Sequence, residues 1–110
     1  MLDFVVTDHW WDEYGSGRKN NEFRRKTPYW DKRIFNALFE CYDDAEAKRI
    51  FQMLQEKRYV NLPLPHPEAR IRHGYSSECR WKTIHGIAIK NGKETDLAID
   101  EDVYSFNFDR

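Results

Sequence analysis

The chain has 110 residues, enough for a single domain over residues 1–110, and its 18 basic and 19 acidic side chains leave a net charge of −1. This charge alone neither favours nor excludes nucleic acid as a partner, and no stretch approaches the roughly 18 continuous apolar residues that span a bilayer. Because the first residues lack a signal-peptide pattern and only two cysteines are present, we expect a cytoplasmic protein with reduced thiols and no membrane partner.

The first third of the chain is predicted to contain two strands and two helical segments. Residues 2–7 are rich in β-branched and aromatic side chains, which is typical of a strand. Residues 8–14 are expected to form one or two helical turns, and only one of the adjacent Trp10 and Trp11 can point inward. A weak alternation indicates a short strand over residues 20–25, and a helix over residues 29–39 is expected to start from the preceding proline.

The clearest predicted helix lies in the middle of the sequence, over residues 44–57. Asp43 and Glu46 have the spacing of a capping box, which marks the start of a helix. Apolar residues then follow at the spacing of one helix face: Ala47, Ile50, Phe51 and Leu54. Residues 62–67 contain three prolines, so we expect an extended connector there rather than a helix or a central strand.

The final third is predicted to be a sheet. Strands are expected over residues 69–75, 83–90, 94–99 and 103–108, and Asn91-Gly92 is a typical two-residue hairpin turn between two of them. Because short turns join most of these strands, the sheet should be largely antiparallel. The predicted fold is therefore α+β: a small, mostly antiparallel β-barrel with one long and one or two short helices.

Opposite charges are concentrated in different parts of the sequence. Between residues 15 and 35, the only acids are Glu22 and Asp31. The same stretch contains seven basic residues: Arg18, Lys19, Arg24, Arg25, Lys26, Lys32 and Arg33. Residues 94–110 instead contain six acids and one arginine. This asymmetry predicts a positive surface that attracts phosphates, and the alternative is a solvated surface that binds no ligand.

The segment from Gly17 to Arg33 contains most of the candidate binding residues. A glycine lets the backbone approach a ligand closely, and Arg18 and Lys19 follow it as donors to phosphate. Glu22 and Arg24 are two residues apart and share one face of a strand, where they either contact a ligand or form a structural ion pair. The surrounding cations are expected to lower the pKa of Glu22 and keep it ionised.

Aromatic and basic side chains are neighbours at the end of this segment. Tyr29 and Trp30 supply two rings beside Lys32 and Arg33, and bases stack on such rings with roughly 1–3 kcal/mol each. The alternative is that both rings belong to the core or to the wall of a cleft. The remaining candidates for contact with nucleic acid come from the strand predicted over residues 69–75: Arg70, Arg72 and Tyr75.

Several short motifs stand out within residues 15–33 and 70–76: Gly17-Arg18-Lys19, Glu22-Phe23-Arg24, Thr27-Pro28-Tyr29-Trp30, Lys32-Arg33 and Arg72-His73-Gly74-Tyr75-Ser76. Together they resemble the ASCH family, especially its short members carried by phages and prophages. The resemblance implies a PUA-like β-barrel, the fold of RNA-binding proteins, with a ligand cleft lined by Lys19, Glu22 and Arg24. Residues 40–68 look like an insertion between the two matching blocks.

The resemblance also bears on enzyme activity. Some small ASCH proteins are amidohydrolases that act on acetylated cytidine through a lysine in this turn, a threonine three residues later and a distant glutamate. Lys19 matches the lysine, but Glu22 stands in the position of the threonine, so this catalytic set is incomplete. Ribonuclease activity has also been attributed to members of the family, and no catalytic set for it can be placed on this chain.

Three hypotheses of function follow from these residues. The first is a domain that binds RNA, another single-stranded nucleic acid, or a nucleotide or nucleoside. The second is a hydrolase of RNA or of a modified nucleoside, with Lys19 as nucleophile or base activator and Glu22 as acid/base. The third is a phage-derived module that binds a host protein through the helix over residues 44–57 and the proline segment. We expect no cofactor and no metal site, because the four histidines lack the spacing of ligand pairs.

Overall fold

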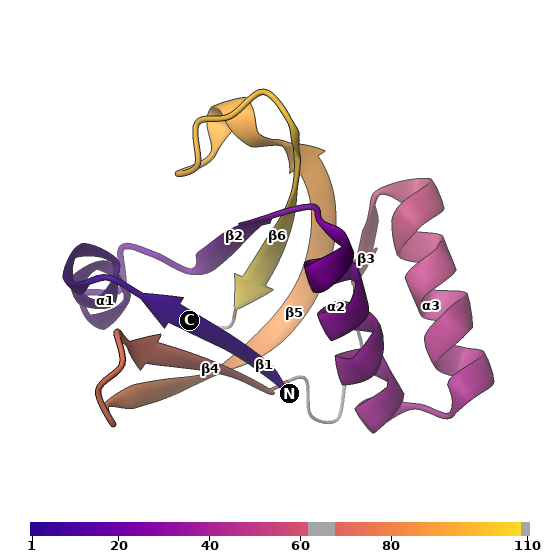
Figure 1. The fold of residues 1–110 in the computed structure, drawn as a ribbon, viewed down its shortest axis with the longest axis horizontal. Helices are drawn as coiled ribbons and strands as arrows, with labels where there is room; N and C mark the ends of the chain where they lie inside the picture. Colours follow the sequence, from indigo (N-terminus) through magenta and orange to yellow (C-terminus); the bar gives the residue numbers. More distant parts are fainter. Residues whose placement is uncertain (62–67, 109–110) are drawn as a thin grey trace.

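A computed structural model of the protein describes residues 1–61 and 68–108 and shows a curled sheet flanked by helices (Figure 1). The strands are β1 (Leu2–Val6), β2 (Asn21–Arg25), β3 (Tyr59–Asn61), β4 (Glu68–His73), β5 (Cys79–Asn91) and β6 (Asp102–Phe108). The helices are α1 (Asp8–Gly15), α2 (Pro28–Cys41) and α3 (Asp44–Lys57), and a 3-10 turn, η1 (Gly92–Glu94), follows β5. The connector predicted over residues 62–67 lies outside the described residues.

The sheet is mixed and curls into a half-barrel. Its strand order is β1-β4-β5-β6-β2, and β3 pairs with β5 beside this path. Only the β1–β4 pair is parallel among the described strands. The 13 residues of β5 pair first with β4 and then with β3 and β6, so one long strand joins the two parts of the sheet. The predicted α+β class with a mostly antiparallel sheet is confirmed, and the arrangement is consistent with a small PUA-like barrel.

Capping residues fix where the two long helices begin. Thr27 is the residue before the proline that begins α2, and its side chain accepts a hydrogen bond from the backbone nitrogen of Trp30 at 3.4 Å. Asp43 accepts from the backbone nitrogen of Glu46 at 2.8 Å, so α3 begins and ends as predicted. α2 has 14 residues and extends two residues beyond its predicted end at residue 39. Within the described part of the chain, no helix is both long enough and apolar enough to cross a membrane.

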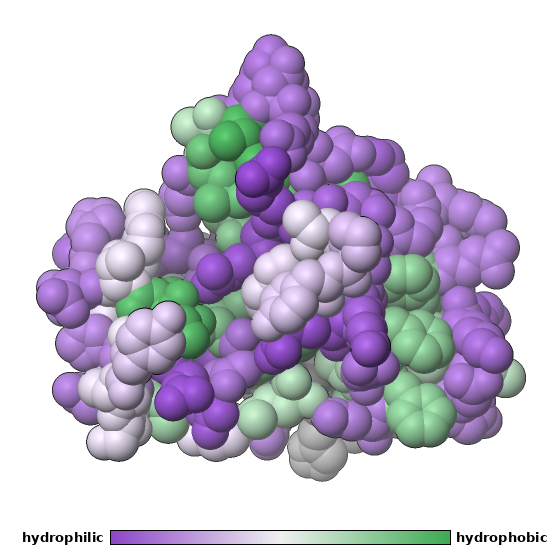
Figure 2. Space-filling model, viewed as in Figure 1, coloured by the Kyte–Doolittle hydropathy of each residue, from purple (hydrophilic) through white to green (hydrophobic). Residues whose placement is uncertain are grey.

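The buried side chains of the sheet and the helices form one core. In β1, the alternating residues Leu2, Phe4 and Val6 are buried and Asp3 faces outward, as the two-residue period of a strand requires. α2 and α3 lie side by side on one flank of the sheet (Figure 1). Each buries one face: Ile34 and Leu38 from α2, and Ala47, Ile50 and Leu54 from α3. On the face drawn in Figure 2, hydrophilic side chains cover most of the surface.

α1 is fixed to the end of β4 by ring and charge contacts. The ring of Trp11 stacks on that of His73, with centroids 4.9 Å apart and planes within 6°. The guanidinium of Arg80 lies 3.8 Å from the Trp11 ring and donates a hydrogen bond to the Trp11 carbonyl oxygen at 2.6 Å. A hydrogen bond with the Asp8 carboxylate raises the pKa of His73. These contacts set the direction in which α1 presents its other side chains.

Arg24 connects the two terminal strands of the sheet, β1 and β2. Its guanidinium donates a hydrogen bond to the carbonyl oxygen of Val5 at 3.1 Å. The same group lies over the rings of Phe4 and Trp30, 5.4 and 5.6 Å from their centroids. A side chain from β2 therefore bridges the seam between β2 and β1.

The connection between β5 and β6 differs from the predicted hairpin. The predictions of a two-residue turn at Asn91-Gly92 and of a strand over residues 94–99 are both wrong, because residues 92–101 form a longer loop. Gly92 is buried, and its backbone nitrogen donates to the Glu101 carbonyl oxygen at 2.8 Å. A Cβ at this position would lie only 2.8 Å from the carbonyl oxygen of Ile99. The glycine thus serves the close packing of the β5–β6 loop rather than a tight turn.

Candidate functional site

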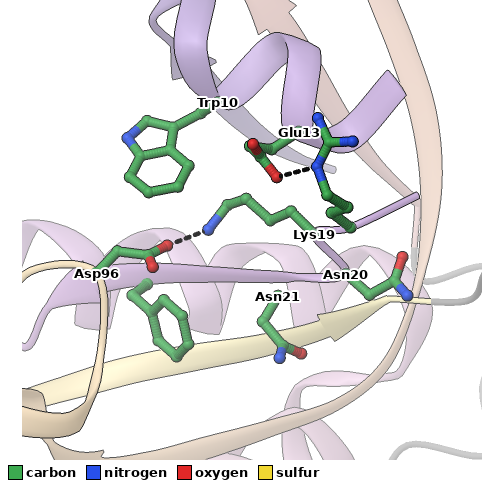
Figure 3. Close-up of a pocket in the computed structure, with 8 residues that line it drawn as sticks. Trp10, Glu13, Lys19, Asn20, Asn21 and Asp96 are labelled. Atoms are coloured by element: carbon green, nitrogen blue, oxygen red, sulfur yellow. Dashed lines mark hydrogen bonds and ion pairs between the residues drawn. The ribbon is translucent and has the colours of Figure 1, made fainter. Parts of the chain in front are cut away.

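A pocket of about 300 Å³ lies between α1, the start of β2 and the β5–β6 loop (Figure 3). This volume is at the lower end of the range for small-molecule sites, roughly 300–1,000 Å³. The lining residues are Trp10, Glu13, Arg18, Lys19, Asn20, Asn21, Phe23 and Asp96. The pocket therefore combines aromatic rings, side-chain amides and charges of both signs.

Lys19 is the central charged group of this pocket. Its side chain is only 8% exposed, and its ammonium forms an ion pair with Asp96 of the β5–β6 loop. In Figure 3 the side chain extends beneath Trp10 toward this carboxylate. The same nitrogen lies 4.7 Å from the ring centroid of Trp10 and 5.2 Å from that of Phe23. Charge and ring faces together hold the ammonium at a fixed place in the pocket.

The turn that brings Lys19 into the pocket begins at Gly17. The φ angle of Gly17 is +80°, a left-handed conformation that glycine adopts at little cost. The backbone nitrogens of Arg18 and Lys19 then both donate to the Glu13 carbonyl oxygen, at 3.1 and 3.2 Å. The Nε of Arg18 also donates to the Glu13 carboxylate at 2.9 Å. The chain is thereby folded back against the last turn of α1.

Glu22 is buried on β2 and is not among the residues that line the pocket. The Tyr14 hydroxyl lies 3.3 Å from its carboxylate, and the Arg24 guanidinium lies 3.7 Å from it, so the expected same-face arrangement with Arg24 is confirmed. The expectation of a lowered pKa is wrong. Burial raises the pKa of Glu22, because the loss of hydration outweighs the opposing charges of Arg24 and Lys19.

A group of basic and aromatic side chains lies at the seam between β2 and β1. Trp30 stacks on Phe4 at 5.4 Å, and the guanidiniums of Arg24 and Arg33 each lie 5.6 Å from its ring centroid. Arg33 also lies 5.3 Å from the ring centroid of Tyr29, which is 61% exposed. Trp30 thus packs against the core, whereas Tyr29 presents a ring to solvent.

The candidates on and beside β4 lie outside the lining of the Lys19 pocket. Arg70 and Arg72 point to the outer face of β4, opposite the buried Ile71, and both form ion pairs with Asp3 of β1. Tyr75, in the turn after β4, is 97% exposed. The structure therefore separates the predicted residues: Arg18 and Lys19 line the pocket, and Arg24, Tyr29, Trp30, Lys32, Arg33, Arg70, Arg72 and Tyr75 do not.

Several pocket residues were not predicted from the sequence: Glu13, Asn20, Asn21, Phe23 and Asp96. Asp96 was placed in a strand, and it is 77 residues from its partner Lys19. The only sequence signal for this pairing was the acidic character of residues 94–110 beside the basic character of residues 15–35. The adjacent tryptophans divide as expected, since Trp11 is buried and Trp10 lines the pocket.

Neither a metal cluster nor a known relative adds to this description. Within residues 1–61 and 68–108, no group of three or more His, Cys, Asp or Glu side chains is placed to hold a metal ion. Comparisons of the chain with family models, with curated proteins and with solved structures find no match.

Proposed function

We propose that the protein is a binding domain for RNA or a nucleotide, and that the Lys19 pocket holds one base and its adjacent phosphate. The observation that carries this proposal is the composition of one pocket of about 300 Å³, which contains two aromatic rings, two side-chain amides and a buried ammonium. Each of these groups has a counterpart on a nucleotide: the face of the base, the edge of the base and the phosphate.

The aromatic and amide groups suit a base. A base that stacks on Trp10 or Phe23 gains roughly 1–3 kcal/mol without regard to its identity. Asn20 and Asn21 each carry an amide that both donates and accepts hydrogen bonds, which matches the mixed donors and acceptors of a base edge. Stacking therefore supplies affinity, and the amides supply orientation.

The ammonium of Lys19 suits a phosphate. A hydrogen bond to a charged group contributes roughly 1.5–3 kcal/mol, more than a bond between neutral groups. The resemblance to ASCH domains, together with a sheet consistent with a PUA-like barrel, favours RNA as the source of this nucleotide.

Binding is favoured over hydrolysis by two features of the site. The Lys19 ammonium is paired with the Asp96 carboxylate, whereas an amine must lose its proton before it acts as a nucleophile. Glu22, the expected acid/base, is buried outside the lining of the pocket.

The proposal is tested by the change Lys19→Met, which keeps most of the side-chain volume and removes the charge. We expect the affinity for ribonucleoside monophosphates and short single-stranded RNA to fall at least about ten-fold, the equivalent of one lost charge-assisted hydrogen bond. Trp10→Ala should lower the affinity for both ligands by a similar factor. The measurements are isothermal titration calorimetry for the nucleotides and fluorescence anisotropy for the RNA.

Lys48→Met is the matched control, because Lys48 is an exposed lysine of α3 paired with Asp44 at 2.9 Å. It should bind as the unchanged protein does. If Lys19→Met binds as tightly as this control, the proposal is wrong. If RNA is instead cleaved, and the cleavage disappears in Lys19→Met while binding persists, the protein is a hydrolase rather than a binding domain.

A further inference from the structure

Two arginines of β4 pair with one carboxylate of β1 on the outer face of the sheet, and a third arginine acts on it through its charge. Arg70 donates two hydrogen bonds to the Asp3 carboxylate, at 2.8 and 3.1 Å, and Arg72 lies 3.7 Å from it. The charge of Arg33, from α2, also acts on Asp3 and helps to lower its pKa. Asp3 and the exposed Glu68, which shares the outer face of β4 with Arg70 and Arg72, offset two of the three cations, so a positive charge of about one remains at this place.

Two of these arginines have donors that the described residues do not use. In residues 1–61 and 68–108, Arg72 contacts Asp3 only at ion-pair distance. The Nε of Arg33 is buried without a hydrogen-bond partner there, and its guanidinium lies over the rings of Tyr29 and Trp30. The partly exposed guanidinium of Arg72 therefore matches the geometry of a phosphate, whereas the buried Nε of Arg33 does not face solvent and Arg33 contributes its charge.

Exposed aromatic rings accompany the arginines. Trp81, which is opposite Arg70 on β5, is 56% exposed, and the Arg70 guanidinium lies 6.0 Å from its ring centroid. Tyr29 is exposed beside Arg33. Rings held next to arginines are the features that bind single-stranded nucleic acid, because bases stack on the rings and phosphates meet the cations.

This surface is connected to the Lys19 pocket by a continuous series of contacts. The Lys19 nitrogen lies 5.5 Å from the ring centroid of Tyr14, whose hydroxyl contacts Glu22. Glu22 pairs with Arg24, which lies over the same Trp30 ring as Arg33. The pocket and the surface are thus linked through side chains that pack inside the seam between β2 and β1.

We propose that this surface, called the Asp3 face and made of Asp3, Tyr29, Arg33, Arg70, Arg72 and Trp81, binds the sugar-phosphate backbone and bases of a single-stranded nucleic acid. The proposal rests on the proposed function of the Lys19 pocket, which holds one base of the same strand. A free nucleotide fills the pocket alone, whereas a strand also contacts the Asp3 face. The ligand is therefore a polynucleotide rather than a free nucleotide.

The test compares Arg72→Gln and Arg33→Gln with Arg49→Gln, which removes an exposed arginine of α3 that pairs with Glu46. Binding of a labelled single-stranded oligoribonucleotide is measured by fluorescence anisotropy over a series of salt concentrations. Each change on the Asp3 face should weaken binding several-fold and reduce the slope of log K against log salt by about 0.7. Arg49→Gln should change neither quantity.

Trp81→Ala separates stacking from charge. It should weaken binding of the oligoribonucleotide roughly five-fold or more while the salt slope stays the same. Binding of nucleoside monophosphates should be unchanged in all the variants of the Asp3 face. Polyglutamate, a polyanion without bases, should bind weakly and with no dependence on Trp81. Equal binding of polyglutamate would instead assign the face to acidic proteins and overturn the proposal.

The remaining outcomes distinguish this proposal from the proposed function. If monophosphates bind but the oligoribonucleotide binds no more tightly, the Asp3 face is not a strand-binding surface and the pocket assignment stands. If the oligoribonucleotide binds through the Asp3 face and Lys19→Met has no effect, the pocket assignment fails and the face remains. If neither ligand binds at low salt, both proposals are wrong.

Discussion

Burial of the Glu22 carboxyl in the fold disfavours its charged form. Arg24 and Lys19 both lower its pKa, but removal from water raises it by more. The neighbouring phenol is shifted by related causes, because burial and the negative charge of Glu22 raise the pKa of Tyr14. Glu22 therefore takes up a proton more readily in the folded protein than in the unfolded chain.

This difference predicts how stability depends on pH. The stability that protonated Glu22 contributes is present below the unfolded value of about 4.5 and is lost as the pH rises through the higher folded pKa. Glu22→Gln stays neutral, so it should be more stable than the unchanged protein at neutral pH and show a flatter pH dependence. Urea unfolding between about pH 4.5 and 8 measures both effects.

Glu68→Gln is the control for this change, because Glu68 is an exposed glutamate of β4. Its stability at neutral pH should differ from that of the unchanged protein by no more than about 0.5 kcal/mol, as at most exposed sites. A Glu22→Gln protein that loses stability at neutral pH would mean that the ion pair with Arg24 outweighs the cost of burial.

At the scale of elements, the β5–β6 loop depends on a glycine for packing rather than for a turn. We expect Gly92→Ala to destabilise the protein by about 1–3 kcal/mol, because the added Cβ would lie 2.8 Å from a backbone oxygen and 2.9 Å from two side-chain carbons. Gly17→Ala tests the other use of glycine, since its φ is positive and nothing lies within 4 Å of its Cβ position. Backbone strain alone should cost about 1–2 kcal/mol there.

Denaturant unfolding measures the loss of stability caused by each glycine change. Gly92→Ala should also change the affinity for nucleotides, because the loop positions Asp96 against Lys19. A Gly92→Ala protein with unchanged stability would show that the loop has room for a Cβ beside the Ile99 carbonyl oxygen.

Elements with local signals could be predicted, and those that depend on distant contacts could not. Asp43 and the proline at the start of α2 act within one helical turn, so both helices were found where they begin. Asn91-Gly92 has a strong local preference for a hairpin turn, but burial of Gly92 against Ile99 overrides it. The same rule holds for the site. The face shared by Glu22 and Arg24 follows from the two-residue period of a strand. The contact between Asp96 and Lys19 instead depends on the pairing of strands that are far apart in the sequence.

At the scale of the whole molecule, the half-barrel depends on a side chain to connect its terminal strands. Arg24→Met should lower the free energy of unfolding by about 1–2 kcal/mol, because it removes the hydrogen bond to Val5 and the contacts with two rings. Hydrogen exchange should show the largest loss of protection in β1 and β2. The double change Arg24→Met/Glu22→Gln should recover part of the loss, since no buried carboxylate is left without its partner.

Arg25→Met is a closely matched control for the seam. Arg25 is the next residue of β2, and its exposed guanidinium pairs with the exposed Glu101 at 2.9 Å. Its removal should change stability by no more than about 0.5 kcal/mol. If both changes cost the same, Arg24 contributes no more to closure than an ordinary surface charge.

In the pocket, the Asp96 carboxylate is the counter-ion of the Lys19 ammonium. Under the proposed function, a phosphate would replace the Asp96 carboxylate at Lys19, and the Asp96 side chain is already one-third exposed to solvent. A neutral ligand that displaced this carboxylate would leave the Lys19 ammonium without an opposite charge. Under that proposal, Asp96 would favour anionic over neutral ligands without contacting the ligand itself. Changes in the β5–β6 loop would then alter the affinity for the proposed nucleotide without changing Trp10, Asn20, Asn21 or Phe23.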